Sequence, residues 1–175
     1  MLILTDTFSN KSSKEKYALN LYSDRIEIYN VHSDHVELKH LINAKDLAGS
    51  VVEESYASLD SSAYLLISSY PSICLDNKLK RRKLLLELVY SKHKDYSSNL
   101  RVVRNWNKSI QKIIDDKSSY DNKKPFLVYA NPISGNGNAC KLILNNVLKV
   151  WSESNVSYKI VLTGKFIYLF FWGYL

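Results

Sequence analysis

Pro125-Phe-Leu-Val-Tyr-Ala-Asn-Pro-Ile-Ser-Gly-Asn-Gly-Asn-Ala139 is the stretch of this 175-residue chain that decides its fold class. Residues Phe126 to Ala130 are an apolar run of the length of a buried strand, and Asn131-Pro132 interrupts it. Gly135 and Gly137 then supply a flexible loop before the chain becomes apolar again. This order predicts a buried strand that ends in a glycine loop.

A helix and a second strand are expected after the loop. The apolar residues of the predicted helix recur at helical spacing and lie on one face: Ala139, Leu142, Ile143, Val147, Leu148 and Trp151. Residues 156–162 alternate like a strand, with Val156, Tyr158, Ile160 and Leu162 on one side. Strand, glycine loop, helix and strand in this order predict a βαβ unit of the kind that builds parallel sheets.

The glycine loop has a physical reason to bind phosphate. Residues without side chains let backbone N–H groups approach phosphate oxygens, and the N-terminus of the following helix carries a partial positive charge. The Walker pattern ending in Gly-Lys-Ser/Thr is absent, and no third glycine completes the dinucleotide-binding pattern. As a bare Gly-x-Gly motif, the loop is therefore compatible with phosphate binding or with a structural turn.

Residues 1–116 are predicted to be mainly β. Apolar residues alternate with polar ones at Leu19–Leu21, Ile26–Ile28 and Val36–Leu38, the period of half-buried strands, and denser apolar runs occupy 63–70 and 84–90. An amphipathic helix follows, with Leu100, Val103, Trp106, Ile110, Ile113 and Ile114 on its apolar face. Several strands closed by one helix resemble, in topology, a pleckstrin-homology-like (PH-like) domain. The chain as a whole is expected to be α+β.

The middle of the chain is basic. Net charge is −5 over residues 1–77, +9 over 78–124 and +3 over 125–175, and Lys78, Lys80, Arg81, Arg82 and Lys83 form a dense run. The run is interpreted either as a solvated turn between two strands or as a surface that binds an anionic membrane. Nucleic acid is not an expected partner, because no recognised nucleic-acid module accompanies the run. Ion pairs between Lys80, Arg81 or Arg82 and the acidic N-terminal half would neutralise this surface.

The complete string Asn131-Pro132-x-Ser134-Gly135-x-Gly137-x-Ala139, between a strand and a helix, resembles the nucleotide loop of the diacylglycerol-kinase-like lipid kinases. Within that superfamily it is most similar to sphingosine kinase, which also has a Thr just after the second strand, as at Thr163, and a strand-rich preceding domain. The resemblance covers residues 125–164. It implies that ATP is contacted by Asn131, Pro132, Ile133, Ser134, Gly135, Gly137 and Thr163. Asn136 and Asn138 stand where relatives often carry a basic residue.

The resemblance implies ATP-dependent, Mg²⁺-dependent phosphorylation of a sphingoid base, from sphingosine to sphingosine 1-phosphate. The family's Gly-Gly-Asp-Gly motif, with its catalytic aspartate, does not occur here, and Glu153 is the one acidic residue after Asp121. Phosphoryl transfer needs carboxylates to hold magnesium and orient the acceptor hydroxyl. We therefore assign no catalytic or metal-binding residue within the chain and expect it to be an inactive, truncated form. The alternative is a noncatalytic membrane- or protein-binding module with a vestigial nucleotide loop.

Four segments follow from these patterns: a PH-like β-rich domain at 1–116, a polar linker at 117–124, an N-terminal fragment of a lipid-kinase catalytic domain at 125–165, and an aromatic tail at 166–175 that is expected to be poorly packed. Two cysteines and the lack of a signal-peptide pattern favour a reduced, intracellular protein. The tail's apolar run is shorter than the roughly 20 residues of a spanning helix. We expect a cytoplasmic protein that associates peripherally with membranes.

Overall fold

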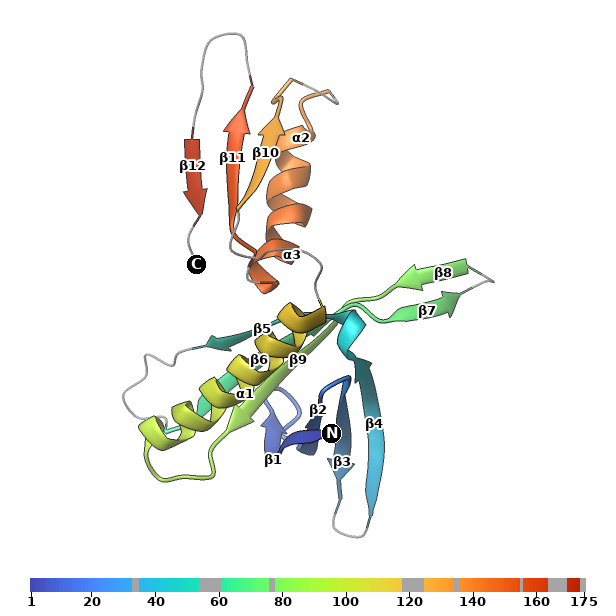
Figure 1. The fold of residues 1–175 in the computed structure, drawn as a ribbon, viewed down its shortest axis with the longest axis vertical. Coiled ribbons are helices and arrows are strands. Elements are labelled where there is room, and N and C mark those ends of the chain that lie inside the picture. Colours follow the sequence, from blue (N-terminus) through green and yellow to red (C-terminus); the bar gives the residue numbers. More distant parts are fainter. Residues whose placement is uncertain are drawn as a thin grey trace. The chain divides into compact units, whose positions relative to one another are not determined.

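The computed structural model describes residues 1–32, 35–53, 61–75, 78–117, 125–133, 136–154, 156–163 and 170–173, with the backbone alone at 75 and 170–173. Strands predominate over helices, and the chain belongs to the α+β class, as the sequence predicts. It divides into two compact units, Met1–Ser118 and Ser119–Leu175 (Figure 1). The predicted linker at 117–124 lies outside the described residues except for Lys117, which ends a helix.

The first unit is an antiparallel sheet with one long helix. Its elements are β1 (Leu2–Asn10), β2 (Lys16–Tyr22), β3 (Arg25–Val31), β4 (Val36–Asn43), the 3-10 turn η1 (Ala44–Asp46), β5 (Leu47–Glu53), β6 (Ala63–Ser69), β7 (Ser72–Leu75), β8 (Lys78–Arg81), β9 (Leu84–Tyr90) and α1 (Tyr96–Lys117). Seven strands pair in the order β4-β3-β2-β1-β9-β6-β5, and β7 and β8 form a separate hairpin. The ladder between β1 and β9 covers Ser9–Val89 and Asn10–Leu88, so a four-stranded meander joins a three-stranded one at this short seam.

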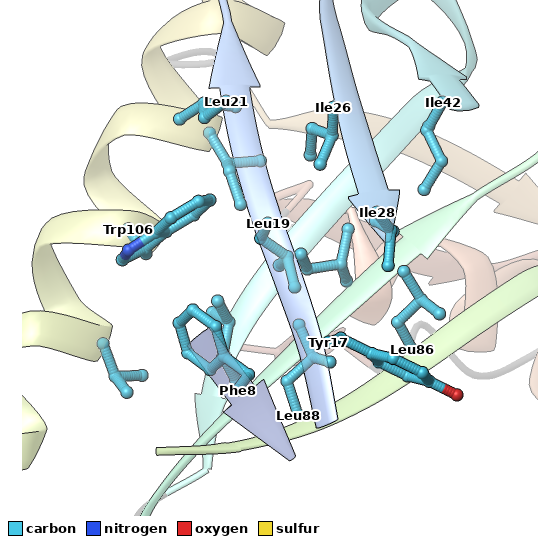
Figure 2. Packing of buried hydrophobic residues seen from close by; sticks show 14 of the residues in the cluster. Phe8, Tyr17, Leu19, Leu21, Ile26, Ile28, Ile42, Leu86, Leu88 and Trp106 are labelled. Atoms are coloured by element: carbon cyan, nitrogen blue, oxygen red, sulfur yellow. The ribbon is translucent and has the colours of Figure 1, made fainter. Parts of the chain in front are cut away.

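One hydrophobic core fills this unit. Phe8 lies against Trp106 edge-on, with ring centroids 5.4 Å apart (Figure 2). The ring centroid of Phe8 also lies 5.2 Å from that of Tyr90. The strands contribute alternate residues, as expected for a sheet with one buried face. Helix α1 packs on β5 and β6 and buries the predicted apolar positions Leu100, Val103, Trp106, Ile110 and Ile113.

Strand β4 forms as predicted, but the expectation that Val36 and Leu38 lie on its buried face is wrong, because both are exposed. The ladder shifts by one residue at Lys39, so that His40 lies opposite Ile28 whereas Leu38 lies opposite Tyr29. Ile28 faces the core and Tyr29 faces outward, so an extra residue at this bulge turns the preceding side chains to the outer face.

The second unit contains the predicted βαβ order. Its elements are β10 (Phe126–Ala130), α2 (Ala139–Leu142), the π-helical turn η2 (Ile143–Val147), α3 (Leu148–Glu153), β11 (Tyr158–Leu162) and β12 (Phe170–Gly173). Strands β10 and β11 are parallel, with Phe126 opposite Tyr158 and Ala130 opposite Leu162. The three helical segments follow one another without a break and form the crossover between these strands (Figure 1). The strand–loop–helix–strand prediction is therefore confirmed.

Two details of the second unit differ from expectation. Leu142 was predicted on the apolar face of the helix and is exposed, because the half-buried stripe runs through Ala139, Ile143, Val147 and Trp151 at a spacing of four and Leu142 lies about 100° away from it. The aromatic tail was expected to be poorly packed because its partner elements are missing, but the backbone of 170–173 does have a partner and pairs antiparallel with β11. This pairing covers an edge of β11 that would otherwise expose unpaired backbone groups. The packing of the tail's side chains lies outside what the structure describes.

Candidate phosphate-binding loop

The loop between β10 and α2 lies at the carboxyl ends of two parallel strands. The arrowheads of β10 and β11 point toward the same end of the sheet, where the loop enters α2 (Figure 1). In α/β sheets, ligands bind in the crevice outside the carboxyl ends of parallel strands, close to helix N-termini. The predicted glycine loop thus occupies the position where this architecture binds phosphate groups.

Asn131 shapes the start of the loop. Its side-chain oxygen Oδ1 accepts a hydrogen bond from the backbone N–H of Ile133 at 3.0 Å, which closes a turn of the kind that Asn forms with its own backbone two residues on. The carboxamide NH₂ group of Asn131 is then its remaining donor. Pro132 is half-buried, and the side chain of Ile133 is exposed, so this part of the loop faces solvent with Asn131.

The end of the loop has a left-handed backbone. Asn136 has φ 56° and Gly137 has φ 78°, and a Cβ atom at Gly137 would lie 3.9 Å from the carbonyl oxygen of Pro132. A side chain would therefore find space at Gly137 but would be strained by its φ angle. Asn138 then adopts a right-handed conformation and its side chain does not cap α2. Successive N–H groups in turns of this kind converge on one side and form concavities that bind anions.

Thr163 lies beside the loop. Its backbone N–H donates to the carbonyl oxygen of Ala130 at 2.8 Å, the residue immediately before Asn131. This bond extends the parallel ladder by one residue and brings the position after β11 next to the position after β10. Of the predicted ATP contacts, the structure thus gathers Asn131, Pro132, Ile133, Gly137 and Thr163 at one end of the sheet. Ser134 and Gly135 lie outside the described residues.

Lys141 is a candidate that sequence reasoning did not identify. It is exposed in the first turn of α2 and shares a shallow groove with Asn138 and Asn145. A positive charge close to the loop would partly replace the basic residues that are missing at Asn136 and Asn138. The only sequence signal was its spacing of four residues after Gly137, which becomes informative once the loop is known to continue directly into a helix.

The residues present do not fit a magnesium ion. Glu153 stands at the end of α3, remote from the loop along the helix, and no group of three His, Cys, Asp or Glu side chains that would hold a metal occurs in the described ranges. Magnesium prefers carboxylate oxygens together with substrate phosphates. The described loop therefore supplies groups for phosphate binding but no carboxylate that would orient an acceptor hydroxyl.

The first part of the basic run, up to Arg81, forms a strand of its own. Lys78–Arg81 is β8 of the β7–β8 hairpin, so the expected turn between two strands is replaced by a ribbon that leaves the main sheet (Figure 1). Arg81 is paired: its guanidinium lies 2.9 Å from the buried Asp46 carboxylate and donates to the carbonyl oxygen of Tyr70 at 2.7 Å. Pairing between the basic run and the acidic N-terminal half, one of the possibilities that the sequence leaves open, is therefore present at Arg81 and holds the base of the hairpin.

No family model matches the chain, and no curated protein matches it either. Within the described ranges, no helix combines the length and the apolar character that crossing a membrane requires.

Proposed function

We propose that residues 125–163 form the start of a nucleotide-binding domain of the diacylglycerol-kinase-like lipid kinases, most similar to sphingosine kinase, and that the loop from Asn131 to Ala139 binds the phosphates of ATP. The observation that carries this proposal is the hydrogen bond from Thr163 to Ala130. It supports a shared site for two motifs that are separated by some thirty residues of sequence and that the lipid-kinase resemblance assigns to one nucleotide.

The parent reaction under this proposal is transfer of the γ-phosphoryl group of ATP to the primary hydroxyl of a sphingoid base. The loop N–H groups, Thr163 and Lys141 bind and orient the phosphates, which is the positioning part of phosphoryl transfer. Magnesium and the catalytic carboxylate, which the family requires, have no fitting residues in the described part of the chain. For the 175-residue chain we therefore expect ATP binding without turnover.

A PH-like assignment of the first unit is part of the same proposal. Seven antiparallel strands in two meanders, followed by a long helix that packs on β5 and β6, support it. The sphingosine-kinase resemblance expects a strand-rich domain before the catalytic region, so both halves of the chain favour one interpretation.

A second candidate function is a noncatalytic binding module with a vestigial nucleotide loop. The lack of a metal-ligating cluster among the described residues favours this candidate for the chain as it stands. The two candidates differ in whether the loop binds ATP, since a vestigial loop has no reason to keep its affinity.

Titration with a fluorescent ATP analogue tests the loop. We expect Gly137→Asp to weaken binding by about tenfold or more, because the new carboxylate repels phosphate and its side chain strains a left-handed backbone. Leu144→Asp is the matched control, since it adds the same charge at an exposed position further along the helix. Equal affinity in the wild type and Gly137→Asp would contradict the loop assignment.

A kinase assay with labelled ATP, magnesium and sphingosine tests the expectation that the chain does not transfer phosphate. Chain purified from a host without sphingosine kinases should give no labelled lipid above a vector control. A longer form that supplies a Gly-Gly-Asp-Gly segment should phosphorylate sphingosine. Transfer to diacylglycerol or ceramide alone would keep the loop assignment and overturn the substrate.

A further inference from the structure

The β7–β8 hairpin presents an apolar residue among positive charges. Leu79 is 78% exposed, and all four residues of β8 are exposed. In the ladder Leu79 lies opposite the exposed Cys74, while Lys80 lies opposite Ile73. Because side chains alternate along a strand, Leu79 and Cys74 share one face of the ribbon, and Lys78 and Lys80 share the other.

Residues 72–82 carry four basic side chains against one acidic residue, Asp76, so this segment has a net positive charge. Within the described part of the chain, no carboxylate forms an ion pair with Lys78, Lys80 or Arg82. Arg81 differs, because Asp46, which is only 6% exposed, neutralises it at the base of the ribbon. An isolated two-stranded ribbon is marginally stable in water. The Arg81 contacts with Asp46 and Tyr70, together with the hydrogen bond from Arg82 N–H to the Pro71 carbonyl, hold its base on the folded sheet.

We propose that the β7–β8 hairpin docks through the free edge of β8 onto the surface of an anionic phospholipid bilayer. In this orientation Leu79, on one face of the ribbon, enters the interfacial region, while Lys78, Lys80 and Arg82 bind lipid headgroups. Long lysine side chains reach charged headgroups while their aliphatic stems stay in the apolar layer. This combination of apolar insertion and electrostatic attraction is what interfacial anchors use. The proposal does not depend on the kinase assignment, because it concerns a different unit and involves no nucleotide.

Lipid is favoured over nucleic acid by the composition of the hairpin. Residues 72–81 contain no aromatic side chain on which a base would stack, and stacking is a main source of affinity for single strands. The exposed Leu79 has no role in binding a phosphate backbone but contributes directly when it is transferred from water to a membrane interface.

Co-sedimentation of the full 175-residue chain with phosphatidylcholine vesicles, with and without phosphatidylserine, tests the proposal. We expect binding that requires phosphatidylserine and weakens as salt rises. The double variant Lys78→Gln/Lys80→Gln should bind about 25-fold more weakly, since each basic residue near an anionic surface contributes about a factor of five. Leu79→Ser should bind about tenfold more weakly through lost apolar transfer. All three residues are exposed, so circular dichroism should show unchanged folding.

Matched controls locate the effect. Lys94→Gln/Arg101→Gln removes two exposed charges near the start of α1, beyond the end of β9 that lies away from the hairpin. Leu144→Ser removes an exposed leucine from the second unit. Both controls should bind within about twofold of the wild type. Hairpin variants that bind vesicles like the wild type, controls that weaken binding equally, or affinity for a single-stranded RNA probe without affinity for vesicles would each overturn the proposal.

Discussion

The two units differ in the size of their hydrophobic cores. Among the described residues of the first unit, twenty form one buried cluster between the sheet and α1. In the second, three apolar residues are buried among those described, Ala130, Ile160 and Val161. Its helix packs on one face of the sheet, where Trp151 stacks on Phe126 with ring centroids 5.6 Å apart. On β10, Leu127 and Tyr129 alternate with these packed positions and are 51% and 66% exposed.

This difference separates stability from the candidate site. Parallel strands are usually covered on both faces, whereas antiparallel sheets tolerate one solvated face. The antiparallel sheet of the first unit has one buried face and one solvated face, as this generalisation expects. The parallel strands of the second unit are not covered on both faces, since apolar residues of β10 are in contact with solvent. The candidate phosphate loop therefore belongs to the unit with the smaller core, where fewer packing contacts hold its geometry. The predictions below test that contrast.

The largest effect is expected at the two helix tryptophans. Trp106→Ala should lower the free energy of unfolding of the first unit by about 3–5 kcal/mol, because it empties the centre of a closed core. Trp151→Ala should cost the second unit about 1–2 kcal/mol, since it removes a half-buried ring and its aromatic contacts. Hydrogen exchange measured by mass spectrometry reports each unit separately in the intact chain. Equal losses in the two units would contradict the contrast between their cores.

A smaller effect is expected in acid, and in the first unit. The Asp95 carboxylate accepts hydrogen bonds from the Ser97 hydroxyl and the Ser98 N–H, both at 2.7 Å, at the start of α1. These bonds lower the pKa of Asp95 from 3.8 to about 2. The stabilisation is therefore complete above the unfolded value and is lost as pH falls through the folded value.

Asp95→Asn should reduce the acid sensitivity of the first unit, because its amide cannot titrate. The change is measured as the dependence of the unfolding midpoint on pH between about 5 and 2. Asp116→Asn, at an exposed position near the other end of α1, is the matched control. An unchanged pH profile in Asp95→Asn would show that the capping bonds do not contribute to acid stability.

The smallest effect is expected on the open face of the second unit. Tyr129→Thr should change the stability of that unit by no more than about 0.5 kcal/mol, because its side chain is largely in water. Ile160→Thr, on the neighbouring strand and buried, should cost about 1–3 kcal/mol by placing a hydroxyl in an apolar site. Thermal unfolding with segment-resolved hydrogen exchange distinguishes the two. A large loss from Tyr129→Thr would mean that this face is covered in solution.

Local patterns in the sequence determined much of this protein. The helical spacing from Leu100 to Ile113 predicted α1 and its buried face, because an α-helix repeats within a few residues of chain. The strand, glycine loop, helix and strand of residues 126–162 predicted a parallel pair for the same reason. Strands β1 and β5 were not identified, because β1 mixes Thr, Asp and Ser with its apolar positions and β5 carries a glycine.

Tertiary structure alone decided the remaining features, because each depends on residues that are distant in sequence. The bulge at Lys39 comes from the register of β4 on β3 and turned Leu38 outward, although its alternation with polar neighbours predicted the opposite. The ion pair between Arg81 and Asp46 distinguishes Arg81 from the other residues of the basic run, because it holds the base of the β7–β8 hairpin on the folded sheet. The bond between Thr163 and Ala130 brought two separate motifs to one end of a sheet. Periodicity carries information about neighbours along the chain, whereas register and long-range pairing are set by the competition among contacts in the folded state.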